Sequence, residues 1–490
     1  MSYTPLTMPE ITVGRWLPKD PAVVEAFVSN LLVHSRVIHG RHPKTCVRFA
    51  EVGENLETAI SRTDIQFDLN RLRCHYRITV GQEQVYTVRA LHPIVQEFQD
   101  FIESEVVVYT AFNEMFEQAP PPQNPDQEKI KDYVDLMEMI DTNLSTAPKY
   151  SDDPVSAMVA GVPYYGIISR FCNTPAGYIA FTHPGVNERF YRVFTEWHRF
   201  LTKPESTSVL NTTDGWLSPD ALKAIVKSSG GDPDKDTFES FFECNPDDPT
   251  YGFNCYDDFF VKELHPRHRT PVFPDDPTIV NSACWSTVHK LYYSLKETDR
   301  FWIKNTPYSL NNILAKDELV DTFVGGTLLQ AILDAKDYHR WLSPVNGTVV
   351  KTRLISGATY RDSPSVPHPT YYAARLDDDD KDLDVISRSQ DFVSNVSTRA
   401  LIFIQAEEPV GLMCFVGVGL GEVSTCNVIV EQGQKLCKGT ELGQFHFGGS
   451  THCLIFRRGL TVKPLDQDGE DLVGSKVRVG KDILTVTKQN

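Results

Sequence analysis

The sequence lacks a hydrophobic run long enough to cross a membrane as a helix. A spanning helix needs about 20 apolar residues, whereas the longest apolar run covers only residues 410–420 and contains three glycines. We interpret this run as a buried strand. The N-terminus also lacks a basic segment followed by an apolar one, so no secretory signal is expected. We therefore predict a protein without a stable membrane anchor.

Positive charge and paired cysteines are also scarce. The chain has 48 Lys and Arg residues against 65 Asp and Glu residues, for a net charge of −17. Without a Lys/Arg-rich run, binding to nucleic acid or to an anionic membrane surface is not expected. The ten cysteines form no Cys-x-x-Cys pair and no Cys/His cluster with zinc spacing, so we predict no metal site. Scattered thiols favour the cytoplasm.

The first half of the chain has the patterns of helices. Asp20 and Pro21 are typical of a helix start, and the apolar residues from Val24 to Leu32 recur at helical spacing. Further helices are predicted over residues 93–118, about 127–144 and from Ser218 to about Gly230, with a hairpin near residues 65–90. This part is therefore expected to be mostly helical.

The pattern changes after the Gly-, Asp- and Pro-rich stretch 230–249. Short β-branched runs then alternate with turn residues, for example at 401–404, 411–420, 426–430 and 451–456. Regular short strands with glycine turns indicate a sandwich or a barrel. We predict an α+β protein with a helical N-terminal domain, residues 1–235, and a β-rich, sandwich- or barrel-like domain, residues 236–490.

Two other patterns lack the residues that a binding function would need. The acidic loop 377–384 has neither the glycine nor the glutamate of an EF-hand, so it is interpreted as a solvated loop. The glycine turns of residues 431–440 are typical of biotinyl and lipoyl carrier domains. Such carriers have an exposed lysine, typically beside a methionine, and no Met-Lys pair occurs here.

The most informative segment is a diglycine, Gly448 and Gly449, directly before Ser450 and Thr451. A nucleophile elbow would need glycine at position 452, where His452 stands. By itself the segment favours an ordinary glycine turn. In a strained Gly-Gly-Ser turn, however, the serine hydroxyl can attack the preceding carbonyl and turn the amide into an ester. Elimination and hydrolysis then leave a pyruvoyl group in place of the serine.

Residues 448–451 resemble the processing motif of the phosphatidylserine decarboxylase family. Residues 256–264 resemble the aromatic block at the start of that family's catalytic domain, and residues 337–347 resemble its histidine block. The three motifs follow in the family's order. Segments similar to a soluble fungal branch, which includes an L-tryptophan decarboxylase, lie at residues 101–104, 215–217, 251–254 and 445–450.

The resemblance implies a chemistry and a set of roles. Cleavage between Gly449 and Ser450 leaves a pyruvoyl cofactor that forms a Schiff base with the substrate amine and accepts electrons while CO₂ leaves. The carbanion is then protonated at Cα, and His339 matches the family's first histidine, the natural acid for this step.

Two positions depart from the family. The aspartate and the second histidine that assist self-processing fall at Cys284 and Leu342. His446 and His452 are the alternative bases for maturation, and a structural role is an equal interpretation of each. An unprocessed protein with a binding function is therefore one alternative.

The main prediction is a pyruvoyl-dependent decarboxylase that converts a free L-amino acid to its amine and CO₂. By resemblance, the substrate is aromatic and tryptophan-like. The second alternative is phosphatidylserine, with phosphatidylethanolamine as the product. The expected partner is a small molecule, and the sequence leaves the oligomeric state open.

Overall fold

A computed structural model describes residues 21–39, 63–68, 73–80, 84–119, 129–150, 163–172, 174–298, 309–333, 336–355, 397–419, 422, 425–446, 450–466, 469 and 471–489. The chain divides into two compact units. The helical unit comprises Lys19–Thr146 and Pro163–Phe200, and the β unit comprises Met1–Pro18, Ala147–Val162 and Leu201–Asn490. The cap at Asp20, the acidic loop 377–384 and the diglycine at 448–449 lie outside the described residues.

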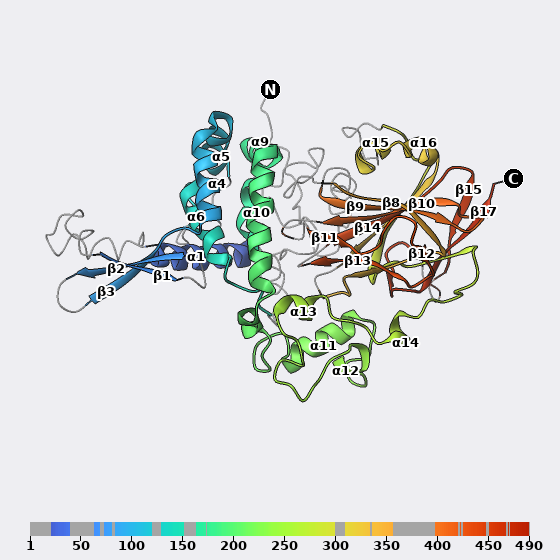
Figure 1. The fold of residues 1–490 in the computed structure, drawn as a ribbon, viewed down its shortest axis with the longest axis horizontal. Helices are drawn as coiled ribbons and strands as arrows, with labels where there is room; N and C mark the ends of the chain where they lie inside the picture. The colour runs from blue at the N-terminus through green and yellow to red at the C-terminus, as the bar shows by residue number, and fades with distance from the viewer. Residues whose placement is uncertain are drawn as a thin grey trace, which may run out of the picture. The chain divides into compact units, whose positions relative to one another are not determined.

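The helical unit confirms the predicted helices (Figure 1). Its elements are α1 (Pro21–Ile38), β1 (Thr63–Asp68), β2 (Arg73–Val80), β3 (Gln84–Arg89), α4 (Pro93–Ser104), α5 (Val106–Gln118), α6 (Tyr133–Asn143), α8 (Pro163–Cys172), α9 (Pro175–Thr182) and α10 (Pro184–Leu201). The predicted hairpin is extended to a three-stranded antiparallel sheet, β1-β2-β3.

One predicted helix is in fact two. The segment 93–118 is interrupted at Glu105, whose φ of −107° and ψ of 105° are extended, so α4 and α5 can fold against each other. The rings of Phe98 and Phe112 then meet edge to face at 6.2 Å, and Phe98 packs on Phe190 of α10 at 5.0 Å. In the ranges that the structure describes, no helix has both the length and the apolar character to cross a bilayer.

The helices of the β unit are short. They are η2 (Pro204–Val209), α11 (Pro219–Ser228), α12 (Phe238–Phe241), α13 (Tyr256–Phe260), α14 (Pro266–Arg269), α15 (Leu310–Ile313) and α16 (Val320–Phe323). The predicted start of α11 is confirmed, because the Ser218 side chain accepts a hydrogen bond from the Ala221 N–H. Gly230 follows the helix with a φ of 72°, a conformation that favours glycine.

Antiparallel sheets form the rest of the β unit. The strands are β4 (Ile279–Asn281), β5 (Ser286–Tyr293), β6 (Thr327–Leu333), β7 (Arg340–Leu342), β8 (Gly347–Ile355), β9 (Arg399–Ala406), β10 (Leu412–Gly419), β11 (Thr425–Val428), β12 (Lys435–Leu436), β13 (Glu441–His446), β14 (Ser450–Phe456), β15 (Leu460–Pro464), β16 (Lys476–Val477) and β17 (Asp482–Lys488). Eight pair in the order β12-β8-β9-β10-β14-β6-β5-β16, and two smaller sheets have the orders β11-β13-β7 and β15-β17-β4.

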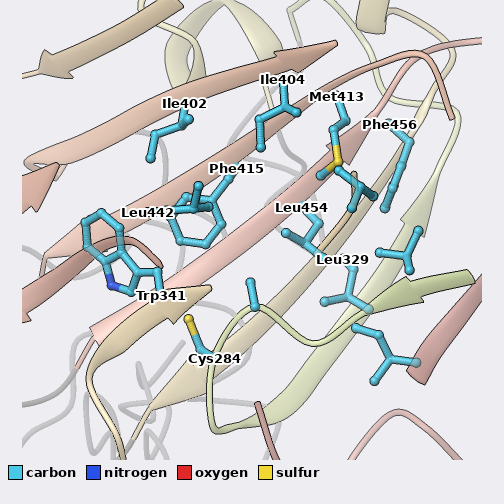
Figure 2. Close-up of a cluster of buried hydrophobic side chains, with 14 of the residues drawn as sticks. Cys284, Leu329, Trp341, Ile402, Ile404, Met413, Phe415, Leu442, Leu454 and Phe456 are labelled. Carbon is cyan, nitrogen blue, oxygen red and sulfur yellow. The ribbon is translucent and has the colours of Figure 1, made fainter. Parts of the chain in front are cut away.

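The three sheets of the β unit share one hydrophobic core. It combines residues of the large sheet, such as Phe415 and Leu454, with Trp341 of β7 and Leu484 of β17, and Figure 2 shows part of this cluster. The predicted buried strand at 410–420 is confirmed as β10, next to β14 in the middle of the large sheet. The α+β fold, helical first and β-rich afterwards, is likewise confirmed.

Candidate active site

Ser450 is the first residue of β14, in the interior of the large sheet. Its register partners are Gly419 of β10 and Leu333 of β6. The residue is fully buried, and within the described ranges its hydroxyl oxygen Oγ has no hydrogen-bond partner. A buried hydroxyl in a protein usually has a hydrogen-bond partner, whereas none of the described residues competes for this oxygen.

Thr451 fixes the start of β14 against β6. Its Oγ1 donates to the carbonyl oxygen of Ala331 at 2.8 Å and accepts from the Gln330 side-chain amide at 3.3 Å. Because the threonine hydroxyl is engaged in this way, Ser450 is the residue of the pair with an available hydroxyl.

His339 lies directly before β7 and is buried, with 1% of its surface exposed. Its carbonyl oxygen accepts a hydrogen bond from the Phe445 N–H at 3.0 Å. Phe445 precedes Ser450 by five residues, and Leu333, opposite Ser450, precedes His339 by six. Residues 333 and 339 therefore pair with residues 450 and 445, so the two segments are joined at both ends.

The His339 imidazole packs on the ring of Phe260, with 4.3 Å between the ring centroids. Phe260 ends α13, the helix formed by the aromatic block. The aromatic block thus forms one wall beside the histidine block, and the two segments that the sequence analysis singled out separately lie together.

His446 ends β13 and pairs with an acidic residue from the same helix. Its Nδ1 donates to the Asp257 carboxylate at 2.8 Å, and the Gln444 side-chain amide donates to its Nε2 at 3.2 Å. The side chains of His446 and Asp257 are 9% and 13% exposed. Sequence reasoning named His446 but not Asp257, which stands 189 residues away.

Arg340 anchors α13 next to these strands. Its Nε donates to the Val261 carbonyl oxygen at 2.8 Å, just after the helix, and its Nη1 donates to Glu441 of β13 at 3.0 Å. A third contact, of 3.4 Å, joins the guanidinium to Glu263. One side chain of β7 therefore ties α13 and β13 together, and this holds Asp257 beside His446.

His452 has different surroundings, although it is only two residues after Ser450. It is fully buried and stacks on Phe415 with 5.9 Å between the ring centroids. Burial lowers the pKa of its imidazole to about 3, and neither ring nitrogen has a hydrogen-bond partner within the described ranges. A neutral imidazole with so low a pKa is a poor general base near neutral pH.

We expect His452→Leu to stay cleavable and to become less sensitive to acid. The folded-state pKa is lower than the unfolded value, so the wild type loses stability as the pH falls from about 6.5 towards 3. Each pKa unit corresponds to about 1.4 kcal/mol, so the loss between pH 7 and 5 is about 2 kcal/mol. Urea unfolding at the two pH values measures it. An equal acid dependence in the variant would contradict this account of His452.

Two sequence models of phosphatidylserine decarboxylase match the chain, one over residues 92–225 and the other over residues 256–485. An L-tryptophan decarboxylase of Psilocybe cubensis is 33% identical over 397 residues, 79% of this chain and 85% of the relative. The corresponding enzyme of Psilocybe cyanescens is 32% identical, over 84% and 90% of the two chains. Decarboxylase iboD of Amanita muscaria is 39% identical over 60% of this chain and 84% of the relative.

This chain belongs to the phosphatidylserine decarboxylase family. It is a decarboxylase, a carboxy-lyase of a family whose members use a serine-derived pyruvoyl group. The resemblance drawn from the three short motifs is confirmed, and it extends into the helical unit.

The two departures from the family's motifs lie side by side. The Leu342 N–H donates to the carbonyl oxygen of Ala283 at 2.8 Å, directly before Cys284. Leu342 and Cys284 are both buried, Cys284 is part of the hydrophobic core (Figure 2), and burial raises the pKa of its thiol well above the ordinary value. Both side chains therefore lie in apolar surroundings.

A pocket of about 340 Å³, with both polar and apolar walls, includes Arg340 of the histidine block. Arg340 lines it together with Lys262, Glu243, Asp258 and Glu263. Lys262 is 5% exposed, its ammonium lies 4.9 Å from the centre of the Phe259 ring, and burial lowers its pKa to about 8. The charges of this pocket are partly paired among themselves, since Arg340 contacts Glu263 at 3.4 Å.

Proposed function

We propose that the chain is a pyruvoyl-dependent decarboxylase of a free aromatic L-amino acid, and that Ser450 is the source of the pyruvoyl group. The observation that carries the proposal is the place of Ser450: its buried hydroxyl is at the start of β14, directly after the diglycine 448–449, in the segment that resembles the family's processing motif. Cleavage would occur between Gly449 and Ser450.

The pyruvoyl group would supply an electron sink for the negative charge that loss of CO₂ leaves at Cα. The chain's own residues complete the reaction. The His339 carbonyl oxygen binds the N–H of Phe445, five residues before Ser450, and its imidazole would hold the proton that Cα receives. Phe260 covers the imidazole from one side, which limits its rotation and its access to water.

Support for an amino-acid substrate comes from the relatives and from charge. Two relatives that this chain covers by 85% and 90% are named L-tryptophan decarboxylases. The net charge of −17 disfavours approach to vesicles of anionic phosphatidylserine.

A substrate panel tests this assignment. Purified protein without added pyridoxal phosphate is assayed for amine formation from tryptophan, phenylalanine, tyrosine, small polar amino acids and phosphatidylserine vesicles. Tryptophan should react fastest and the other aromatic amino acids should compete, because a modest change in an apolar group costs only about 1–3 kcal/mol in a pocket. Turnover of the vesicles alone would overturn the substrate assignment and leave the pyruvoyl chemistry intact.

The unprocessed binding protein is the second candidate, and the apolar pair Cys284 and Leu342 favours it. A purified protein of full-length mass that turns over no substrate would support it. The cytoplasm is our proposal for its location, because no disulfide joins the eight described cysteines.

A further inference from the structure

We infer that Asp257 and His446 act as the base pair for cleavage at Ser450, in place of the positions occupied by Cys284 and Leu342. This inference rests on the proposed function, since it requires Ser450 to be cleaved. It assigns a role to Asp257, whose position in the aromatic block gives no indication of one.

The hydrogen bonds of His446 determine where its lone pair lies. A carboxylate can only accept, so the proton of the 2.8 Å contact with Asp257 is on Nδ1. An amide NH₂ group can only donate, so Nε2 accepts from Gln444 and carries the lone pair. This is the arrangement of a general base oriented by a carboxylate on its other nitrogen.

The strand pairing puts this base at the cleavage segment. His446 is the last residue of β13 and Ser450 is the first residue of β14. Opposite them, Thr425 of β11 pairs with His446 and Gly419 of β10 pairs with Ser450. His446 and Ser450 are four residues apart in the chain, and their partners Thr425 and Gly419 are six apart. His446 therefore stands at the end of β13 that leads to β14.

The other candidates for the base are weaker on chemical grounds. The side chain of Leu342 cannot carry a proton, and the Cys284 thiol is held neutral in the core. His452 has a pKa of about 3 and no orienting carboxylate within the described ranges. His446, by contrast, is bonded to a carboxylate, the group that orients a general base.

The step that the pair would catalyse is an acyl shift from nitrogen to oxygen. Nε2 of His446 takes the Oγ proton of Ser450 as Oγ bonds to the carbonyl carbon of residue 449. The C–N bond to Ser450 then breaks, and the imidazolium returns the proton to the leaving amine. The Asp257 carboxylate stabilises the imidazolium between these two transfers. Elimination at the ester and addition of one water complete the change to the carboxylate of residue 449, ammonia and the pyruvoyl group.

The test follows cleavage in full-length protein by pulse–chase translation and gel electrophoresis. We expect His446→Ala to slow cleavage by roughly 10²–10⁴-fold and Asp257→Asn to slow it at least tenfold. Asp258→Asn is the matched control for the cleavage step alone, which needs no substrate: Asp258 lies on the same helix but binds the backbone and side chain of Asn254. Gln444→Ala removes only the donor that occupies Nε2, so it should cleave at least as fast as the wild type.

Hydroxylamine separates a chemical role from a structural one. It cuts an accumulated ester, so a variant blocked after the acyl shift is cut at residue 449, whereas a variant blocked at the shift stays whole. We expect His446→Ala to stay whole, with a thermal unfolding transition like that of Asp258→Asn. Wild-type cleavage rates in His446→Ala, or its cutting by hydroxylamine, would overturn the assignment. If Gln444→Ala slowed cleavage as much as Asp257→Asn, the assignment would also be overturned, because the contacts of His446 would then be structural. A wild type that never cleaves would instead refute the proposed function.

Discussion

Ser450→Ala should remain one chain of 490 residues and should form no amine from any amino acid. The variant loses the hydroxyl that attacks the preceding carbonyl, so neither the ester nor the pyruvoyl group can form. The change removes a single oxygen without a hydrogen-bond partner in the described ranges, so folding should be preserved or slightly improved. Gel electrophoresis and an amine assay measure the two effects on one preparation.

The chain offers a closely matched control for this variant. Ser286 is on β5 of the same sheet, is equally buried, and its Oγ also has no hydrogen-bond partner in the described ranges. Ser286→Ala should be cleaved and active like the wild type. Cleavage of Ser450→Ala at the same place would show that the hydroxyl is not the nucleophile.

His339→Ala should lose decarboxylation by a factor of roughly 10²–10⁴, the typical contribution of a positioned acid. It should still be cleaved, because its proposed role is to protonate Cα during turnover, after the pyruvoyl group has formed. Activity should be expressed per cleaved molecule, so that incomplete maturation is not counted as slow chemistry.

Phe260→Leu is a useful companion to His339→Ala. It removes the ring that packs on the imidazole at 4.3 Å but leaves the acid in place. A smaller loss of activity is expected than for His339→Ala. Full activity of cleaved His339→Ala would move the acid role to another group.

Local patterns predicted much of the fold. Ser218 and Gly230 predict where α11 begins and ends, and the apolar run at 410–420 predicts the central strand β10. The break at Glu105 was missed, because both sides of it have helical spacing and only the packing of Phe98 on Phe112 separates them. Propensity along the chain contains no information on such a contact.

The candidate site was predictable as far as short motifs reach. Ser450, His339 and His446 are proposed from their segments, and the apolar residues Cys284 and Leu342 are visible in the sequence; their roles stay predictions. The carboxylate of Asp257 was missed, because it reaches His446 only after α13 is tied to β7 and β13 by Arg340. Such a pairing depends on tertiary structure across 189 residues, and no local spacing predicts it.

The mass of the purified wild-type protein tests the central claim most directly. The account predicts two chains, residues 1–449 and a fragment of 41 residues, 450–490. The small fragment should have an N-terminus that is blocked by a pyruvoyl group, and borohydride added together with the substrate should label that fragment. A protein of full-length mass that still decarboxylates amino acids would contradict the account.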